Sequence, residues 1–218
     1  MGQGGYIFCE WDSVAKDYKA YREAFRELDH RAISKAGVDW GGVGTPLKCG
    51  YLFPATGEFG RTSILPELFD PNPLTYGGAQ FGAAAAVPGF IVPPAYWRQY
   101  FAIGGNQILI QGCRSGEIIP EDWKIAWIGL AFPNKQMQIT EIRFQIGQRK
   151  YGRINLEEMH SYNKPAIIFE EGFILDEEEG FELYGYVEQP LDFQRIVMLG
   201  AAYYRRIDQA LGVVGAVI

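Results

Sequence analysis

The sequence contains little of what catalysis, a disulfide framework or cofactor binding needs. Two histidines, His30 and His160, occur in 218 residues, and the three cysteines, Cys9, Cys49 and Cys113, form no C-x-x-C pair. A disulfide framework needs more cysteines in an even number, so we expect mostly buried thiols, with one disulfide and one free thiol as the alternative. The motifs G-x-S-x-G, G-x-x-x-x-G-K-[ST] and H-E-x-x-H are all missing. We therefore expect no enzyme activity, no cofactor and no metal.

Clusters of carboxylates leave three weaker alternatives. His160 and the two glutamates shortly before it would supply metal ligands, but a single histidine without a paired motif is a weak signal, and structural ion pairs produce the same clusters. The acidic cluster between residues 170 and 179 lacks the D-x-[DN]-x-[DN]-G order of a calcium loop, which favours solvated acidic turns. Glu170 and Glu182 would suit a glycosidase only across a groove, and the sequence does not fix their separation.

Positive charge is scarce at the start of the chain. The formal net charge is −6, and the first 15 residues contain no lysine or arginine. Proteins that hold nucleic acid through its phosphates usually present a basic arm or face, so we expect no direct, extensive nucleic-acid binding; a local basic patch stays open. The chain opens with no basic segment before an apolar run, and no apolar run reaches about 18 residues. We expect no signal peptide, no membrane-spanning helix and synthesis in a cytosol.

Aromatic residues and turn formers, in contrast, are plentiful. Aromatics make up 15% of the chain, and 27 glycines and 12 prolines indicate many turns, which favours an all-β protein with long loops. Apolar and polar residues alternate with period two in much of 138–208, as at Ile142, Phe144 and Ile146, so one face of each strand should lie on a core. Other expected strands lie at 123–132, 166–169, 173–175, 181–187 and 195–205. About eight strands at this spacing predict a mostly β, jelly-roll-like β-sandwich.

One amphipathic helix is expected before these strands. Asp12 or Ser13 would serve as its N-cap, and Gly37 stands where a left-handed C-terminal residue belongs. Its apolar positions share one face: Val14, Tyr18, Tyr21, Phe25 and Leu28. This aromatic face could bind a partner, but we favour packing on the protein's own sheet, because most helical stability comes from such packing.

Two further segments, a Pro/Gly-rich extension and an apolar tail, are candidates for contacts with other subunits. Eight of the 12 prolines lie between residues 46 and 94, in a long Pro/Gly-rich extension that also carries apolar anchors. We divide the chain into an N-terminal helix and extension, 1–95, and a β-sandwich domain with its tail, 96–218. The tail, 211–218, is apolar and too short to cross a bilayer, so it should be buried in its own core, in a neighbour or against lipid. Its candidate assembly contacts are Leu211, Val213, Val214, Val217 and Ile218, alongside Tyr18, Tyr21 and Phe25 of the helix.

The succession of strands at 139–146, 164–169, 172–176, 180–187 and 195–204 resembles the layout of viral jelly-roll capsid proteins, over residues 96–208. The resemblance implies a structural subunit that assembles into a virion shell through its extension and tail. Its partners would be copies of itself and other shell proteins, with the apolar tail meeting a membrane or an inner layer. It would be made in the host cytoplasm. The missing basic arm departs from many such proteins and puts genome packaging by this subunit in doubt.

The rival interpretation is a carbohydrate- or ligand-binding jelly roll. Exposed tryptophans at Trp97, Trp123 or Trp127, with nearby carboxylates, would form its sugar platform. An enzyme such as a glycoside hydrolase or a cupin-like metalloenzyme is the third interpretation; a cupin needs several histidines converging on one metal, and two distant histidines cannot supply that set.

Overall fold

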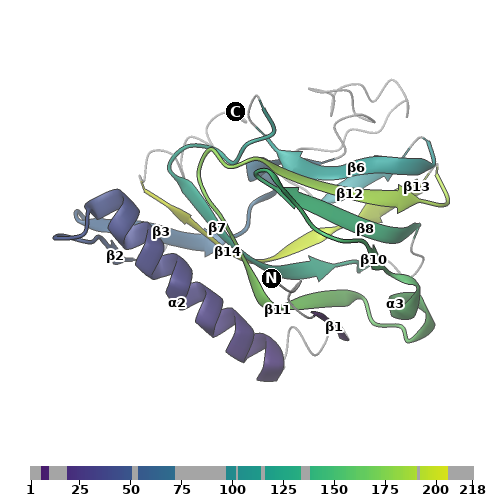
Figure 1. Ribbon diagram of the computed structural model, residues 1–218, viewed down its shortest axis with the longest axis horizontal. Helices are drawn as coiled ribbons and strands as arrows, with labels where there is room; N and C mark the ends of the chain where they lie inside the picture. The colour runs from purple at the N-terminus through teal and green to yellow at the C-terminus, as the bar shows by residue number, and fades with distance from the viewer. Residues whose placement is uncertain are drawn as a thin grey trace.

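The computed structural model describes residues 6–9, 19–50, 54–71, 97–101, 103–113, 116–133, 138–190 and 192–205 (Figure 1). The first elements are β1 (Tyr6–Cys9), α2 (Lys19–Gly41), β2 (Lys48–Cys49), β3 (Glu58–Ser63), η1 (Pro66–Leu68), β4 (Phe69–Pro71), β5 (Arg98–Phe101), β6 (Gly105–Gly112) and β7 (Trp123–Ala131). They are followed by β8 (Ile139–Ile146), β9 (Arg149–Lys150), β10 (Ile154–Asn155), α3 (Glu157–Ser161), β11 (Ala166–Leu175), β12 (Phe181–Val187), β13 (Asp192–Arg195) and β14 (Val197–Tyr204).

Two antiparallel sheets form a jelly roll. One sheet holds β3, β14, β7 and β11 side by side, and the other holds β6, β12, β8 and β10. We number these eight strands 1 to 8 along the chain. The strand order is then 1-8-3-6 in the first sheet and 2-7-4-5 in the second, so that most consecutive strands lie in different sheets. This is the double-sheet arrangement of a jelly roll. The predicted fold class, a mostly β, jelly-roll-like sandwich with an N-terminal helix, is confirmed.

Short strands extend both sheets beyond this framework. β1 pairs antiparallel with β11, and β2 pairs parallel with β3. β4 lies beside β6, β9 lies beside β8, and β5 with β13 makes a separate two-stranded sheet. β1 to β4 come from the first 95 residues and pair with strands of the sandwich. The boundary at residue 95 stays a prediction.

The space between the sheets is filled by aromatic rings. The indole of Trp127 on β7 lies 5.0 Å from the rings of Phe144 and Phe169, 5.3 Å from Phe181 and 5.6 Å from Phe173, measured between ring centroids. Its Nε1–H donates to the Gly129 carbonyl at 2.7 Å, which satisfies the one polar atom of this fully buried side chain. Such packing approaches crystal-like density, so the interior is a solid core.

A second core lies between one sheet and helix α2. Figure 1 shows α2 lying along the outer face of the sheet that holds β11, β7 and β14, and its residues contact all three strands. The buried helix residues are Leu28, Ala32, Ala36 and Trp40. Because α2 covers its outer face, β7 is buried at all nine positions rather than on alternate ones. The interpretation that this helix packs on the protein's own sheet is confirmed.

The predicted end of the helix is wrong. Gly37 lies inside α2, which continues to Gly41, and Gly42 takes the left-handed conformation with φ 92°. Gly37 is needed for a different reason: the following chain crosses it so closely that a Cβ would lie 2.6 Å from the Leu47 carbonyl oxygen. The expected N-cap residues, Asp12 and Ser13, lie outside the described residues.

No helix in the described ranges is both long and apolar enough to span a membrane. The apolar tail, 211–218, lies outside them.

Candidate functional site

A buried lysine organises the junction of α2 and the sandwich. The alternation along β7 points Trp123 and Trp127 between the sheets, so Lys124 faces α2 on the other side. Its side chain is 2% exposed, and its Nζ lies 2.9 Å from Asp39 Oδ2 and 2.9 Å from Asp176 Oδ1. Because Asp39 belongs to α2 and Asp176 to the β11–β12 turn, one cation joins three elements. We call these three residues, with Glu177, Lys35 and Trp40, the Lys124 cluster.

The remaining members of the Lys124 cluster complete its hydrogen bonding. Lys35 Nζ lies 2.8 Å from Asp176 and 3.2 Å from Asp39, and Trp40 Nε1–H donates to Glu177 Oε1 at 3.2 Å. Burial acts to lower the pKa of Lys124, but the hydrogen bonds to Asp176 and Asp39 outweigh it and raise that pKa above its usual value. The hydrogen bond from Lys124 holds the pKa of Asp39 below its usual value. These directions keep the ions charged, as a structural anchor requires.

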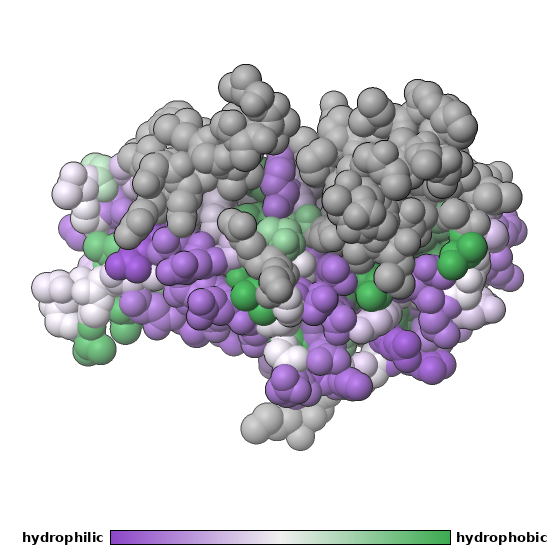
Figure 2. All heavy atoms as spheres, turned by 90° about the horizontal axis from the view of Figure 1, so that it is seen from above, coloured by the Kyte–Doolittle hydropathy of each residue, from purple (hydrophilic) through white to green (hydrophobic). Residues whose placement is uncertain are grey.

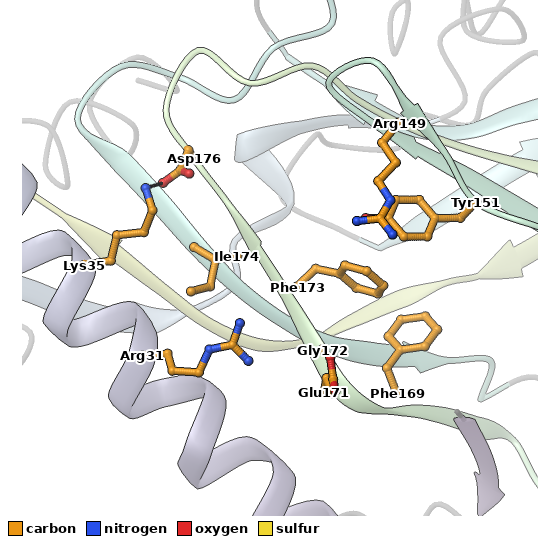
Figure 3. Close-up of a pocket in the computed structure, with 10 residues that line it drawn as sticks. All are labelled: Arg31, Lys35, Arg149, Tyr151, Phe169, Glu171, Gly172, Phe173, Ile174 and Asp176. Carbon is orange, nitrogen blue, oxygen red and sulfur yellow. Dashed lines mark hydrogen bonds and ion pairs between the residues drawn. The ribbon is translucent and has the colours of Figure 1, made fainter. Parts of the chain in front are cut away.

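A hollow of about 520 Å³ adjoins the Lys124 cluster. In Figure 3, Arg31 and Lys35 reach it from α2, Arg149 and Tyr151 lie on the opposite side, and β11 runs between them. Phe173 and Ile174 of β11 form its apolar part, near Gly172, where the register of β11 against β7 shifts. The left-handed backbone of Gly172, with φ 64°, makes this bulge compatible with the close approach of α2.

The chemistry of this hollow suits binding rather than catalysis. Its described lining residues include no serine, cysteine or histidine. Arg149 is held over the ring of Tyr151 at 5.0 Å, and Arg31 is exposed. Glu171 and Asp176 offset part of this positive charge. The hollow could therefore receive a small ligand with one acidic group and an apolar body.

Two smaller hollows of opposite charge lie on the other sheet. One, of about 330 Å³, is lined by Arg143, Lys150 and Arg153 together with Tyr151 and Tyr184; we call it the basic hollow. The other, of about 390 Å³, is lined by glutamates and is called the acidic hollow: Glu117, Glu178, Glu179 and Glu182. Burial, followed by a hydrogen bond to Glu182, raises the pKa of Tyr184 to about 12, so its phenol stays neutral.

The structure describes only part of the predicted contact set. Tyr21 and Phe25 stack with ring centroids 5.7 Å apart and pack, half-buried, against the core between α2 and the sheet. A contact of either ring with a partner stays a prediction. Tyr18 and the five tail residues lie outside the described residues.

The predicted sugar platform is wrong for two of its three tryptophans. Trp123 is 2% exposed and Trp127 is fully buried, because both point between the sheets. Trp97 is half-buried with its ring 6.0 Å from that of Phe69. Cys49 and Cys113 are free thiols, as expected, but the prediction that they are buried is wrong, because Cys49 is half-buried and Cys113 is exposed.

Among the described residues, the predicted carboxylate clusters form no metal or catalytic site, and one of them has a structural role. No group of three potential metal ligands occurs in the described ranges, and His30 and His160 are both exposed. Glu170 and Glu182 stand on strands of different sheets. The acidic turn after β11 is not simply solvated, since Asp176 and Glu177 pair with Lys124. The alternation around Lys124 was visible in the sequence, but it did not show that the predicted helix packs over this strand.

No protein-family model, no curated protein and no solved structure matches this chain.

Proposed function

We propose that this chain is a structural subunit that assembles with copies of itself, and with other proteins of the same layer, into a shell such as a virion capsid. The observation that carries the proposal is the solid interior of a complete jelly roll. Jelly rolls serve as capsid subunits, lectins and cupins. A cupin-like enzyme works inside its sandwich, and here that space is occupied by the rings around Trp127. The working surfaces would then be on the outside, where subunits meet.

The anchoring of α2 also supports an assembly role. Because the Lys124 cluster ties Asp39 of the helix to β7 and to the β11–β12 turn, helix and sandwich form one rigid block. Rigid blocks suit shells, since each subunit must present its contact surfaces in a fixed geometry. The proposed extra contacts are the extension and the apolar tail, which would meet a neighbour or a membrane or inner layer. Synthesis in a host cytoplasm and location in a virion belong to the same proposal.

Deletion of residues 211–218 tests the tail. If the tail is a contact, the deletion should abolish large assemblies, as measured by light scattering and negative-stain imaging, while circular dichroism of the β-core stays unchanged. A second variant, Val213→Asp/Val214→Asp, keeps the length and should act in the same direction, because a charge in an apolar interface is costly. Unchanged particles in both variants would remove the tail from the proposal.

Binding of a small acidic ligand, such as an acidic sugar, is the second candidate. It is favoured by the 520 Å³ hollow, which offers Arg31 and Arg149 beside the apolar surface of Phe173. An acidic-glycan array distinguishes the two functions. Binding that is lost in Arg149→Ala and kept in Arg26→Ala, by a protein that stays monomeric, would favour the ligand-binding function.

A further inference from the structure

We propose that the basic hollow contacts the acidic hollow of a second copy of this chain, so that two copies pair about a two-fold axis through this part of the sandwich. This inference rests on the proposed assembly function and assigns it a contact surface.

The basic side of the contact is held in place before binding. The Arg143 guanidinium lies 5.2 Å from the centre of the Tyr184 ring, and that of Arg149 lies 5.0 Å from the centre of the Tyr151 ring. Lys150, next to Arg149 on β9, is exposed. Arg153 lies 3.4 Å from Glu141, the one carboxylate that pairs with these cations among the described residues. Three cations thus line this hollow, Arg149 lies beside it over Tyr151, and they repel one another; Glu182 and Glu117 of the acidic hollow, which act on Tyr184, offset part of this charge.

The acidic side is a matching excess of negative charge. Glu117 and Glu178 are exposed, and Glu179 and Glu182 line the same hollow. None of the described residues that line it is a lysine or arginine. The acidic hollow is the counterpart of the basic hollow in the proposed contact.

The two hollows adjoin each other. Gln145 of β8 lines both of them, and the Gly147 N–H donates to the Gly180 carbonyl at 2.7 Å, which joins the β8–β9 turn to the connection between β11 and β12. In a two-fold contact, residue i of one copy meets residue j of the other, and j meets i. Two adjacent patches of opposite sign satisfy this condition, because the rotation places each on the opposite patch of the partner.

The same arrangement disfavours other occupants. A nucleic acid or sulfated polymer would run from the basic hollow onto four glutamates, which repel its backbone. Base stacking on Tyr151 is blocked as well, since Phe144 stacks on this ring at 4.6 Å and Arg149 lies over it. An apolar partner finds no broad apolar patch in the described surface. Figure 2 shows scattered green among purple on one face, and the described residues include five exposed large hydrophobics, of which three lie in loops, one on α2 and one on β12.

A charge-swap experiment tests the contact on the full chain. Lys150→Glu/Arg153→Glu, at two residues that line the basic hollow, makes this surface mainly acidic, and Glu117→Lys/Glu178→Lys makes it mainly basic. Each variant alone should associate at least about 100-fold more weakly than wild type, because like charges then face each other. An equimolar mixture should associate again, since each acidic surface meets a basic one. The readout is mass by light scattering and sedimentation at matched concentrations.

Controls separate this contact from folding and from net charge. Arg26→Glu/Arg195→Glu changes the net charge as much as the first variant, at two exposed positions on α2 and β13, and should assemble like wild type. Circular dichroism must report the same fold in all variants. Raising the salt from about 0.1 M to about 1 M should weaken wild-type association, because exposed charges are screened.

Several outcomes would overturn the contact. Assemblies that survive both charge reversals, or a mixture that fails to associate, would refute it while leaving the shell proposal in place. Binding of a fluorescent single-stranded oligonucleotide that Lys150→Glu/Arg153→Glu abolishes would assign the basic hollow to nucleic acid instead. A wild type that is monomeric at every concentration and salt would overturn the shell proposal together with the contact.

Discussion

Replacing Lys124 by methionine should destabilise the protein far more than the same replacement at Lys35. Both lysines pair with the same two carboxylates, at 2.9 and 2.9 Å from Lys124 and at 3.2 and 2.8 Å from Lys35. They differ in burial, since the side chain of Lys124 is 2% exposed and that of Lys35 is 42% exposed. The two variants therefore compare a buried and an exposed lysine on the same two carboxylates, with one further difference, the 3.6 Å approach of Lys124 to Glu177.

The expected magnitudes follow from what each variant leaves behind. Removing one partner of a buried ion pair typically costs 3–5 kcal/mol, and we expect about 3 kcal/mol for Lys124→Met. We take the lower end of this range for two reasons. Asp39 and Asp176 still pair with Lys35 in the variant, and their side chains are 37% and 31% exposed, so that water solvates them in part. Lys35→Met should cost less than about 1 kcal/mol, as exposed pairs do.

Urea unfolding at several pH values measures both effects. The folded-state pKa of Asp39 lies below its usual 3.8, so the stability it provides is present above that value and is lost as the pH falls through the folded-state pKa. The raised pKa of Lys124 keeps its contribution complete throughout the neutral range, with loss only at strongly alkaline pH. The cost of Lys124→Met should thus stay constant from about pH 5 to 8 and shrink below about pH 4. Equal losses for the two variants, or a neutral Lys124→Met, would refute this reasoning.

Two further substitutions probe the core between α2 and the sheet. Gly172→Ala should cost at least about 2 kcal/mol, because a Cβ would lie 2.6 Å from Leu28 Cδ2 on a backbone with φ 64°. Gly147→Ala, whose nearest neighbour is the Glu179 carboxylate at 3.4 Å, is its control and should cost only about 1 kcal/mol. Tyr203→Phe should cost about 1.5 kcal/mol, because the buried hydroxyl donates to Asp29, and a smaller loss in urea unfolding would deny that bond a role.

The fold was accessible from the sequence because period-two alternation and turn signals are local. Two predicted strands, 139–146 and 181–187, coincide with β8 and β12. The expected strands 166–169 and 173–175 are one strand, β11, interrupted by a bulge that leaves Gly172 against Leu28 of the helix. That bulge depends on the packing of α2, which the local pattern does not contain.

The candidate site was less accessible because it depends on contacts between distant segments. Lys124 meets Asp39 and Asp176 only once α2 covers β7, so no local pattern indicated that this charged residue would be buried. The predicted sugar platform was wrong for the same reason. Alternation places Trp123 and Trp127 on one face of a strand, but it does not show that the second sheet covers this face. The basic hollow likewise combines distant segments, because Tyr184 of β12 lines it together with residues of β8 and of the chain that follows β8.

The most direct test of the central claim is the mass of the purified full-length protein in solution, by light scattering over a range of concentrations, with negative-stain images of the same samples. A shell subunit should give large, uniform particles or closed rings, or smaller oligomers whose mass rises with concentration. A mass equal to that of one 24.5 kDa chain at every concentration would contradict the account.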